Sequence, residues 1–489
     1  MNSQKSHWAE AAALLYVSLP ALIFFAFFVR LAIAIPACSL IAACWYALIR
    51  KTQWVSPLRI SQQTVYMLAL SIAWLFLAGN LGWIQQNLDW IKHYSILNYL
   101  GSHPWPATIK VDGLSGEWAI RYSIGWYLVP AFVIKYFWLP YPKIISGIWS
   151  VIGVFLFFRM LIDILPNKRA VFIAPLIFML FSGADIIGTA ITHFQVLLTY
   201  HIEWWDGWIE YGSNMTSMFW VPQHAIPTWI GIALMIRQTQ RATILPYLAL
   251  YFSAVCLWSP FSAIGLAPFA LVLLRQYGFR EIVLDWRPIA SIALVAAPIF
   301  FYLTADAGSM PHGPMWVGDN RYVWKGGPWF SAGSFALFCL IEFALPAVIL
   351  LLVPKFRQPF ILVAIVSLLL IPLYRVGAFN DFGMRTSIAG LAVLSISAGE
   401  LIAAGPRIAA IAMAIALAFG VPTAMGEVLR GFGLAPHIDT NAELARSLND
   451  HPEVLPQYFA RLPVAVLRGL NAQPANAATA SNNQRSSSN

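Results

Sequence analysis

Apolar and polar residues occur along this chain in long alternating blocks. The apolar blocks are about as long as an α-helix must be to cross a bilayer. Blocks of this length predict an all-α polytopic membrane protein with about thirteen transmembrane helices. The expected spans are 14–28, 31–48, 64–83, 144–164, 171–187, 229–236, 244–258, 262–274, 288–304, 335–353, 360–373, 387–402 and 408–421.

Polar segments between these blocks suggest four regions. Residues 1–63 form an N-terminal helical hairpin with a basic loop, and residues 64–169 form a core that contains a polar loop at 85–143. Residues 170–424 complete the bundle, with outer loops at 188–228, 305–331 and 374–386. The tail, 425–489, is expected to be disordered from about residue 471, because its Asn, Ala and Ser residues offer no apolar pattern to bury.

Composition and charge agree with a membrane protein. Hydrophobic residues make up 59% of the chain and charged residues 10%. The net charge of +9 is spread over loops without a basic arm, so we expect contact with membrane lipids and not with nucleic acid. Basic residues in short loops favour a cytoplasmic amino terminus, and an odd number of spans then puts the carboxyl terminus outside. These basic residues are Lys5, Arg50, Lys51, Arg59, Lys168, Arg169, Arg237, Arg241, Arg275, Arg280, Arg287, Lys355, Arg357 and Arg407.

The first polar loop carries the most concentrated chemistry. Asp89 follows the apolar block 64–83, and Lys92 and His93 lie three and four residues later, on one face if the segment is helical. Asp112 and Glu117 come later in the same loop. Ionisable groups at a membrane surface mark a functional site or a solvated helix end. An aromatic stretch, 122–138, follows, and its proline and lysine favour a helix lying in the interface.

This order of features resembles the first extracytoplasmic loop of the GT-C glycosyltransferases, over residues 64–169. The matching features are an early Asp, the amphipathic IKHYSILNYL, the turn HPWPATI, a later acid, and the aromatic helix WYLVPAFVIKYFW. The likeness is closest to the bacterial aminoarabinose and mannosyl transferases. The chain departs from the pattern at Trp90, where many members carry a second acid, and in the extra hairpin before the loop.

The resemblance implies a GT-C-like bundle with interfacial helices in its catalytic loop, 85–143, in a bacterial inner membrane with a periplasmic carboxyl terminus. The donor would be a polyprenyl-phosphate sugar, and the acceptor an envelope glycan, lipid or protein. Asp89 would be the general base, and Glu117 would be the later acid, with Asp112 as its competitor. Lys92, His93 and Arg121 would bind substrate, although Lys92 and His93 also suit an ordinary surface pair. The resemblance leaves open whether a divalent cation takes part, and no other cofactor is expected.

The second polar segment, 193–228, holds acids and a histidine among several tryptophans. Aromatic faces stack on sugar rings and carboxylates bind their hydroxyls, so Glu203, Asp206 and His224 are candidate sugar-binding residues. The alternative is an aromatic belt at the membrane interface. His193, His201 and His224 lack the spacing of known zinc motifs, and no metal ligand is assigned.

A third motif, YRVGAFNDFGMR, joins two apolar blocks at 374–385. Arginine forks suit phosphate oxygens, so Arg375 and Arg385, with Asn380 and Asp381 between them, are candidate ligands of the donor phosphate. The alternative is a structural Arg–Asp pair. For the whole chain, the rival functions are a polymerase or ligase of lipid-linked glycans, a transporter, and an assembly partner in envelope export.

Overall fold

Helices form most of the computed structural model. The structure describes residues 8–52, 61–109, 118–193, 200–207, 209–278, 280, 284–305, 308, 310–317, 330–433, 458–460 and 467. The tail from residue 471, which the sequence predicts to be disordered, lies outside these ranges.

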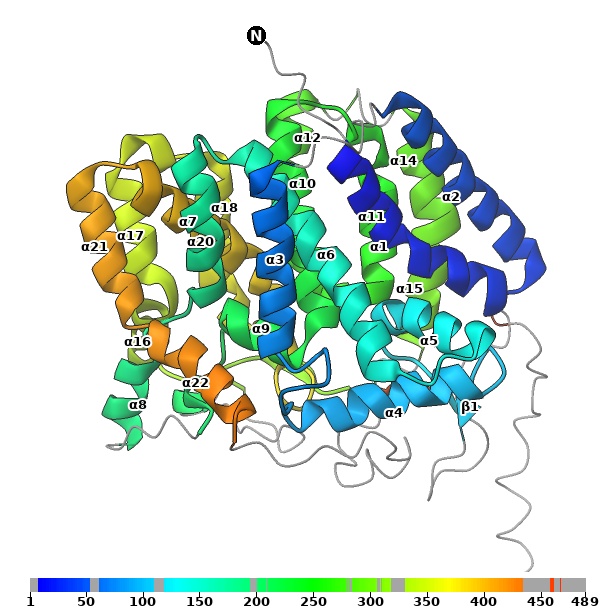
Figure 1. The fold of residues 1–489 in the computed structure, drawn as a ribbon, viewed down its shortest axis with the longest axis horizontal. Helices are drawn as coiled ribbons and strands as arrows, with labels where there is room; N and C mark the ends of the chain where they lie inside the picture. The colour runs from blue at the N-terminus through cyan, green and yellow to red at the C-terminus, as the bar shows by residue number, and fades with distance from the viewer. Residues whose placement is uncertain are drawn as a thin grey trace, which may run out of the picture.

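Long helices run side by side through the molecule (Figure 1). They are α1 (Trp8–Phe27), α2 (Leu31–Lys51), α3 (Gln62–Leu77), α6 (Pro142–Ile164), α7 (Lys168–Leu180), α10 (Pro222–Gln240), α11 (Leu248–Trp258), α12 (Pro260–Tyr277), α18 (Pro359–Leu370), α20 (Ile388–Ala404) and α21 (Arg407–Ala418). Two more are continuous through a short π-helical turn: α14 (Trp286–Ser291) with α15 (Ala297–Thr304), and α16 (Ala332–Cys339) with α17 (Leu345–Leu352).

Among the described residues, seven helices are long and apolar enough to cross a membrane. An eighth is added if α21 and α22 (Val421–Gly431), which meet at 42°, count as one bent span. The expectation of a helical multi-pass membrane protein is confirmed at this level. A helix occupies each of the thirteen predicted blocks, but the shorter ones, such as α3 and α18, do not pass the length test. The count of thirteen spans therefore stays a prediction.

Short elements gather at one end of the bundle (Figure 1). Helices α4 (Asp89–Ser102) and α5 (Gly125–Phe137) lie there across the direction of the long helices, and α8 (Asp185–His193) and α22 lie at the same end. We call this the α4 end. The remaining short helices are α9 (Asn214–Trp220), α19 (Asp381–Thr386), and the 3₁₀ turns Ile202–Trp205, Leu245–Tyr247, Pro354–Phe356 and Ile371–Leu373.

Two small antiparallel sheets, which the all-α prediction did not include, tie distant segments together. One has the strand order β1 (Thr108–Ile109), β2 (Trp118–Ile120), β5 (Phe459–Ala460). The other pairs β3 (His312–Pro314) with β4 (Tyr374–Val376). The first sheet brings part of the C-terminal tail against the first polar loop, which matters for the site described below.

The bundle packs closely because small residues lie where helices touch. A Cβ added to Gly399 of α20 would lie 2.7 Å from the Cα of Ala174 in α7, so only glycine permits this approach. Trp74 and Trp229 stack in the core with ring centroids 5.2 Å apart. At the opposite end from α4, Arg237 and Glu10 form an ion pair of 2.7 Å with both side chains 2% exposed. Such burial requires pairing, because an isolated charge would lose its hydration.

Candidate functional site

Asp89 is the first residue of α4, at the end of the bundle where the short elements gather. A carboxylate in the first turn of a helix is stabilised by the helix dipole. One helical turn places Lys92 beside it, with Nζ 3.3 Å from Asp89 Oδ2. The Asp89 side chain is 30% exposed and the Lys92 side chain is 16% exposed, so the pair is open enough to meet a ligand.

His93 holds α4 in position. Its ring is buried, with Nδ1 2.5 Å from the Tyr127 hydroxyl of α5 and Nε2 2.9 Å from the carbonyl oxygen of Trp220. Burial, and after it the charge of Lys92, lowers the pKa of His93 to about 3, so the ring is neutral at physiological pH. His93 thus orients the Asp89 turn by hydrogen bonds and adds no positive charge to it.

Arg385 of α19 joins this group from far along the chain. It forms an ion pair of 3.6 Å with Asp381. Burial acts to raise the pKa of Asp89, but Lys92 first, and after it His93 and Arg385, outweigh burial and hold that pKa below its ordinary value. Asp89 is therefore ionised at neutral pH. Asp89 and Lys92 form one ion pair, Asp381 and Arg385 form another, and the charge of Arg385 acts on Asp89. Their role in substrate binding stays a prediction.

Tyr458 is a member of this group that sequence reasoning missed. The Lys92 ammonium lies 5.5 Å from the centre of the Tyr458 ring, and this ring stacks on Tyr122 at 4.6 Å. Burial acts to lower the pKa of Lys92, but Asp89 and the two tyrosines hold it well above its ordinary value. Lys92 is therefore a fixed cation. We call Asp89, Lys92, Arg385 and Tyr458 the Asp89 site.

Four of the predicted substrate-binding residues make contacts within the protein, and their role in binding stays a prediction. Arg121, which is buried, donates to the carbonyl oxygen of Leu303 at 2.9 Å. Arg375, also buried, donates to the carbonyl oxygen of Val317 beside the β3–β4 pair. The other two are Asn380, which caps α19 with φ of 57°, and His224, whose Nδ1 lies 2.6 Å from Ser259 Oγ. Asp112 and Glu117 lie outside the described residues, so their roles stay predictions.

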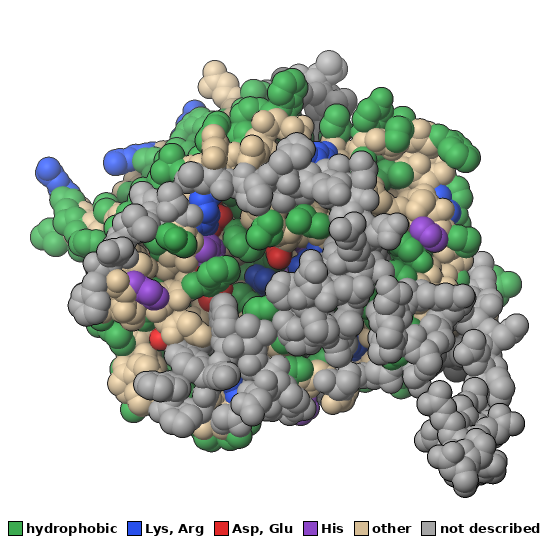
Figure 2. Space-filling view, turned by 90° about the horizontal axis from the view of Figure 1, so that it is seen from below, with side chains coloured by type: hydrophobic (Ala, Val, Ile, Leu, Met, Phe, Trp, Pro, Cys, Tyr) green, Lys and Arg blue, Asp and Glu red, His purple; other side chains and the backbone are tan. Residues whose placement is uncertain are grey.

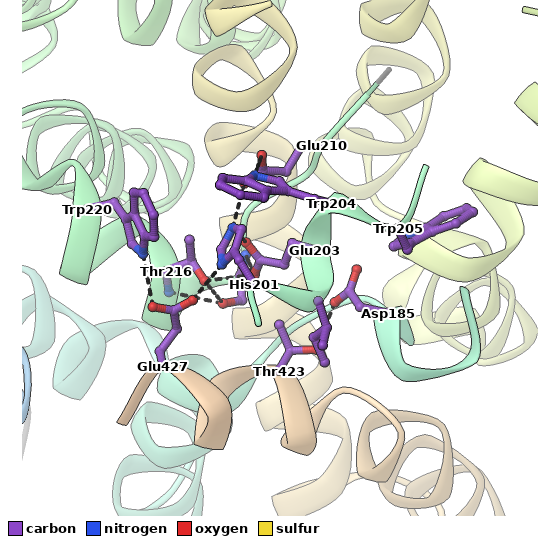
Figure 3. Close-up of polar contacts among 12 residues, drawn as sticks. Asp185, His201, Glu203, Trp204, Trp205, Glu210, Thr216, Trp220, Thr423 and Glu427 are labelled. Carbon is purple, nitrogen blue, oxygen red and sulfur yellow. Dashed lines mark hydrogen bonds and ion pairs between the residues drawn. The ribbon is translucent and has the colours of Figure 1, made fainter. Parts of the chain in front are cut away.

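A second polar cluster lies at the same end and is centred on His201 (Figure 3). Glu203 and Glu210 come from the same segment, and Glu427 comes from α22. His201 Nε2 lies 3.3 Å from carboxylate oxygens of Glu203 and of Glu210, and Nδ1 lies 2.8 Å from Glu427 Oε1. Atoms of His201, Glu203 and Glu210 lie within 4.8 Å of one another, which suits a metal ion. Glu203, a predicted sugar-binding residue, is buried in this His201 cluster, and its role in sugar binding stays a prediction.

A cavity of about 160 Å³ lies beside the His201 cluster and is lined by the residues just before Asp89. One wall is the segment that leads into α4, residues 85–88, and another holds His201, Trp220, Glu427 and Arg430. Figure 2, which looks onto this end, shows acidic, basic and histidine side chains near the middle of the face among hydrophobic ones. The remaining lining residues are Ala78, Phe219 and Gly431.

Asp206 lies in the same segment as His201, Glu203 and Glu210, and its pKa provides a test of the electrostatics there. Burial raises its pKa to about 7, against a smaller lowering by a hydrogen bond from the Ile209 amide. Between about pH 4 and 7 the folded state therefore binds the proton that the unfolded state has lost, and stability falls as pH rises through this range. We expect Asp206→Asn to raise the unfolding temperature at pH 8 and to leave it unchanged at pH 4, by thermal unfolding in detergent. An equal effect at both pH values would contradict this assignment.

Comparison of the chain with protein-family models, with curated proteins and with solved structures finds no match.

Proposed function

We propose that this protein is a membrane glycosyltransferase that moves a sugar from a polyprenyl-phosphate donor to an envelope glycan, lipid or protein. The observation that carries the proposal is the ion pair of Asp89 with Lys92 at one end of a bundle of apolar helices. A second cation, Arg385, pairs with Asp381 and acts on Asp89 through its charge. A lipid-linked sugar needs this combination, because its lipid lies among apolar helices while its phosphate and sugar lie at the membrane surface.

The reaction can be written with these residues alone. Asp89 takes the proton of an acceptor hydroxyl as the hydroxyl oxygen bonds to the anomeric carbon of the sugar. The bond between that carbon and the phosphate oxygen breaks, and polyprenyl phosphate leaves. Lys92 and Arg385 stabilise the negative charge that grows on the leaving phosphate. The lowered pKa of Asp89 keeps the carboxylate ready to accept a proton at neutral pH.

The aromatic residues fit a substrate of this kind. Tyr122 and Tyr458 stack beside Lys92, and Trp220 lines the adjoining cavity. Flat aromatic faces are suitable partners for sugar rings and for cations. Helices α4 and α5 carry apolar and aromatic side chains and lie across the bundle, as helices in a membrane interface do. The donor would enter beside them from the lipid.

The proposal puts the Asp89 site on the extracytoplasmic side of a bacterial inner membrane. The amide of Gln85, just before α4, bonds to the carbonyl oxygen of Gly431 at 3.2 Å, so Gly431 lies on the same side as the site. We expect alkaline phosphatase fused after Gly431 to be active and the same enzyme fused after Lys168 to be inactive. The reverse pattern of the two fusions would put the site in the cytoplasm and contradict the proposal.

Transfer itself is tested with purified protein in nanodiscs. The protein is incubated with radiolabelled polyprenyl-phosphate sugars and a crude envelope fraction, and the acceptor is separated from the donor by extraction into organic solvent. We expect label to move into the acceptor only when protein and matching donor are both present. Failure of every donor sugar tried, with protein that stays folded, would favour the rival readings as a transporter or an export component.

A further inference from the structure

The His201 cluster has three carboxylates around one imidazole. Nδ1 of His201 lies 2.8 Å from Glu427 Oε1, while Nε2 lies 3.3 Å from both Glu203 Oε2 and Glu210 Oε1. Arg430 contacts Glu427 and reaches His201 Nδ1 at 3.0 Å. Nε2 therefore faces one oxygen of each of two carboxylates, and a cation bound there would displace any proton on Nε2.

The carboxylates are held so that one oxygen of each faces His201. The other oxygen of each is occupied by a donor outside the cluster (Figure 3). These donors are the Ser213 amide and Thr216 hydroxyl on Glu203 Oε1, the Trp204 indole on Glu210 Oε2, and the Trp220 indole on Glu427 Oε2. Outer hydrogen bonds of this kind orient the ligands of metal sites.

The inner side of the cluster gathers carboxylate oxygens that few donors among the described residues reach. Glu203 Oε2 makes no hydrogen bond to the described residues, although the side chain is 1% exposed. Within the described part of the chain, the ion pair of this cluster with an arginine is that of Arg430 with Glu427. Buried carboxylate oxygens without donors are costly, and a bound cation would remove that cost.

The spacing of the three inner atoms suits a cation. Two ligands bound at the ordinary 2.0–2.2 Å to a tetrahedral zinc ion lie about 3.4 Å apart. The measured separations from His201 Nε2 to Glu203 Oε2 and to Glu210 Oε1 are both 3.3 Å. A single N–H on Nε2 could point at one of these two oxygens but not at both. A cation between the three atoms would bind all of them.

We infer that His201 Nε2, Glu203 Oε2 and Glu210 Oε1 bind a divalent transition-metal ion such as Zn²⁺ or Mn²⁺, with Glu427 orienting His201 from behind. A ligand set of one imidazole nitrogen and two carboxylate oxygens suits these ions better than Mg²⁺ or Ca²⁺, which prefer oxygen alone. The ion would be held by the 201–210 segment, which His201 and Glu427 link to α22 at the wall of the cavity. It binds whether or not the protein transfers sugars.

The test measures metal directly. Protein without an affinity tag is stripped with a chelator, titrated with Zn²⁺ or Mn²⁺ and desalted, and the bound metal is counted by mass spectrometry. We expect one ion per chain in wild type. Glu203→Gln and Glu210→Gln should lose it, and Glu427→Gln should bind it about 10–100-fold more weakly. Asp206→Asn is the matched control, because it removes an acid from the same segment and should bind normally.

A spectroscopic measurement covers the case in which the glutamine variants do not fold. Pulsed electron paramagnetic resonance on Mn²⁺-loaded wild type should detect coupling to one imidazole nitrogen, that of His201. Absence of stoichiometric metal in folded wild type, unchanged binding in both Glu203→Gln and Glu210→Gln, or a Mn²⁺ signal without nitrogen coupling would each overturn the inference.

Discussion

Asp89→Asn is expected to lower turnover by a factor on the order of 10²–10⁴, because an amide keeps the shape of the carboxylate but cannot take a proton from the acceptor. Donor affinity should change little, since the leaving phosphate is held by Lys92 and Arg385. The measurement is the initial rate of sugar transfer in nanodiscs, with donor binding determined on the same preparation.

Asp285→Asn is the control for this variant. Asp285 also pairs with a nearby cation, Arg287, at 2.7 Å, but it begins α14 at the other end of the bundle. We expect its transfer rate to equal that of wild type. Wild-type turnover in Asp89→Asn would remove the base assignment, and a loss of donor binding equal to the loss of turnover would make Asp89 a binding residue.

Arg385→Lys is expected to weaken donor binding by about 1–3 kcal/mol, which is roughly 5–150-fold in affinity. Lysine keeps the charge but loses the planar fork that can hold two phosphate oxygens. Within the described residues, the buried Nε of Arg385 has no hydrogen-bond partner, and the ion pair of its Nη2 with Asp381 is 3.6 Å long. The affinity is measured by titration of the purified variant with radiolabelled donor.

Arg287→Lys makes the same substitution in a fork that is already filled by Asp285, with contacts of 2.9 and 2.7 Å. It should leave donor affinity unchanged. Equal donor affinity in Arg385→Lys and wild type, together with a lowered unfolding temperature, would show that Arg385 only pairs with Asp381. That result would leave Lys92 as the single phosphate ligand of the Asp89 site.

Local patterns in the sequence were sufficient to predict α4, α5 and the Asp89 turn. A helical segment beginning at Asp89 puts Lys92 beside it, and the two residues do form an ion pair. The apolar blocks also predicted the helices, because a buried or membrane-facing helix needs a continuous run of apolar residues. The number of spans is harder to predict, because helices buried within the bundle can be shorter and less apolar than helices that face lipid.

Contacts between distant segments could not be predicted from the sequence. Tyr458 reaches Lys92 only because β5 pairs with β2, and nothing in the tail signals this pairing. His201 and Glu427 are 226 residues apart, and the spacing of histidines gave no reason to join them. Arg375 and Arg385 look alike in their motif, yet Arg375 is buried against Val317 while Arg385 lies near Asp89. Only the packing of the bundle separates these roles.

The most direct test of the central claim is to follow the donor lipid. Purified wild-type protein is reconstituted with a polyprenyl-phosphate sugar and an acceptor, and free polyprenyl phosphate is counted by chromatography beside the sugar transferred. We predict one polyprenyl phosphate released for each sugar transferred, with both lost together in Asp89→Asn. A donor that stays intact in the presence of folded protein and acceptor, or that crosses the bilayer with its sugar–phosphate bond unbroken, would contradict the assignment as a glycosyltransferase.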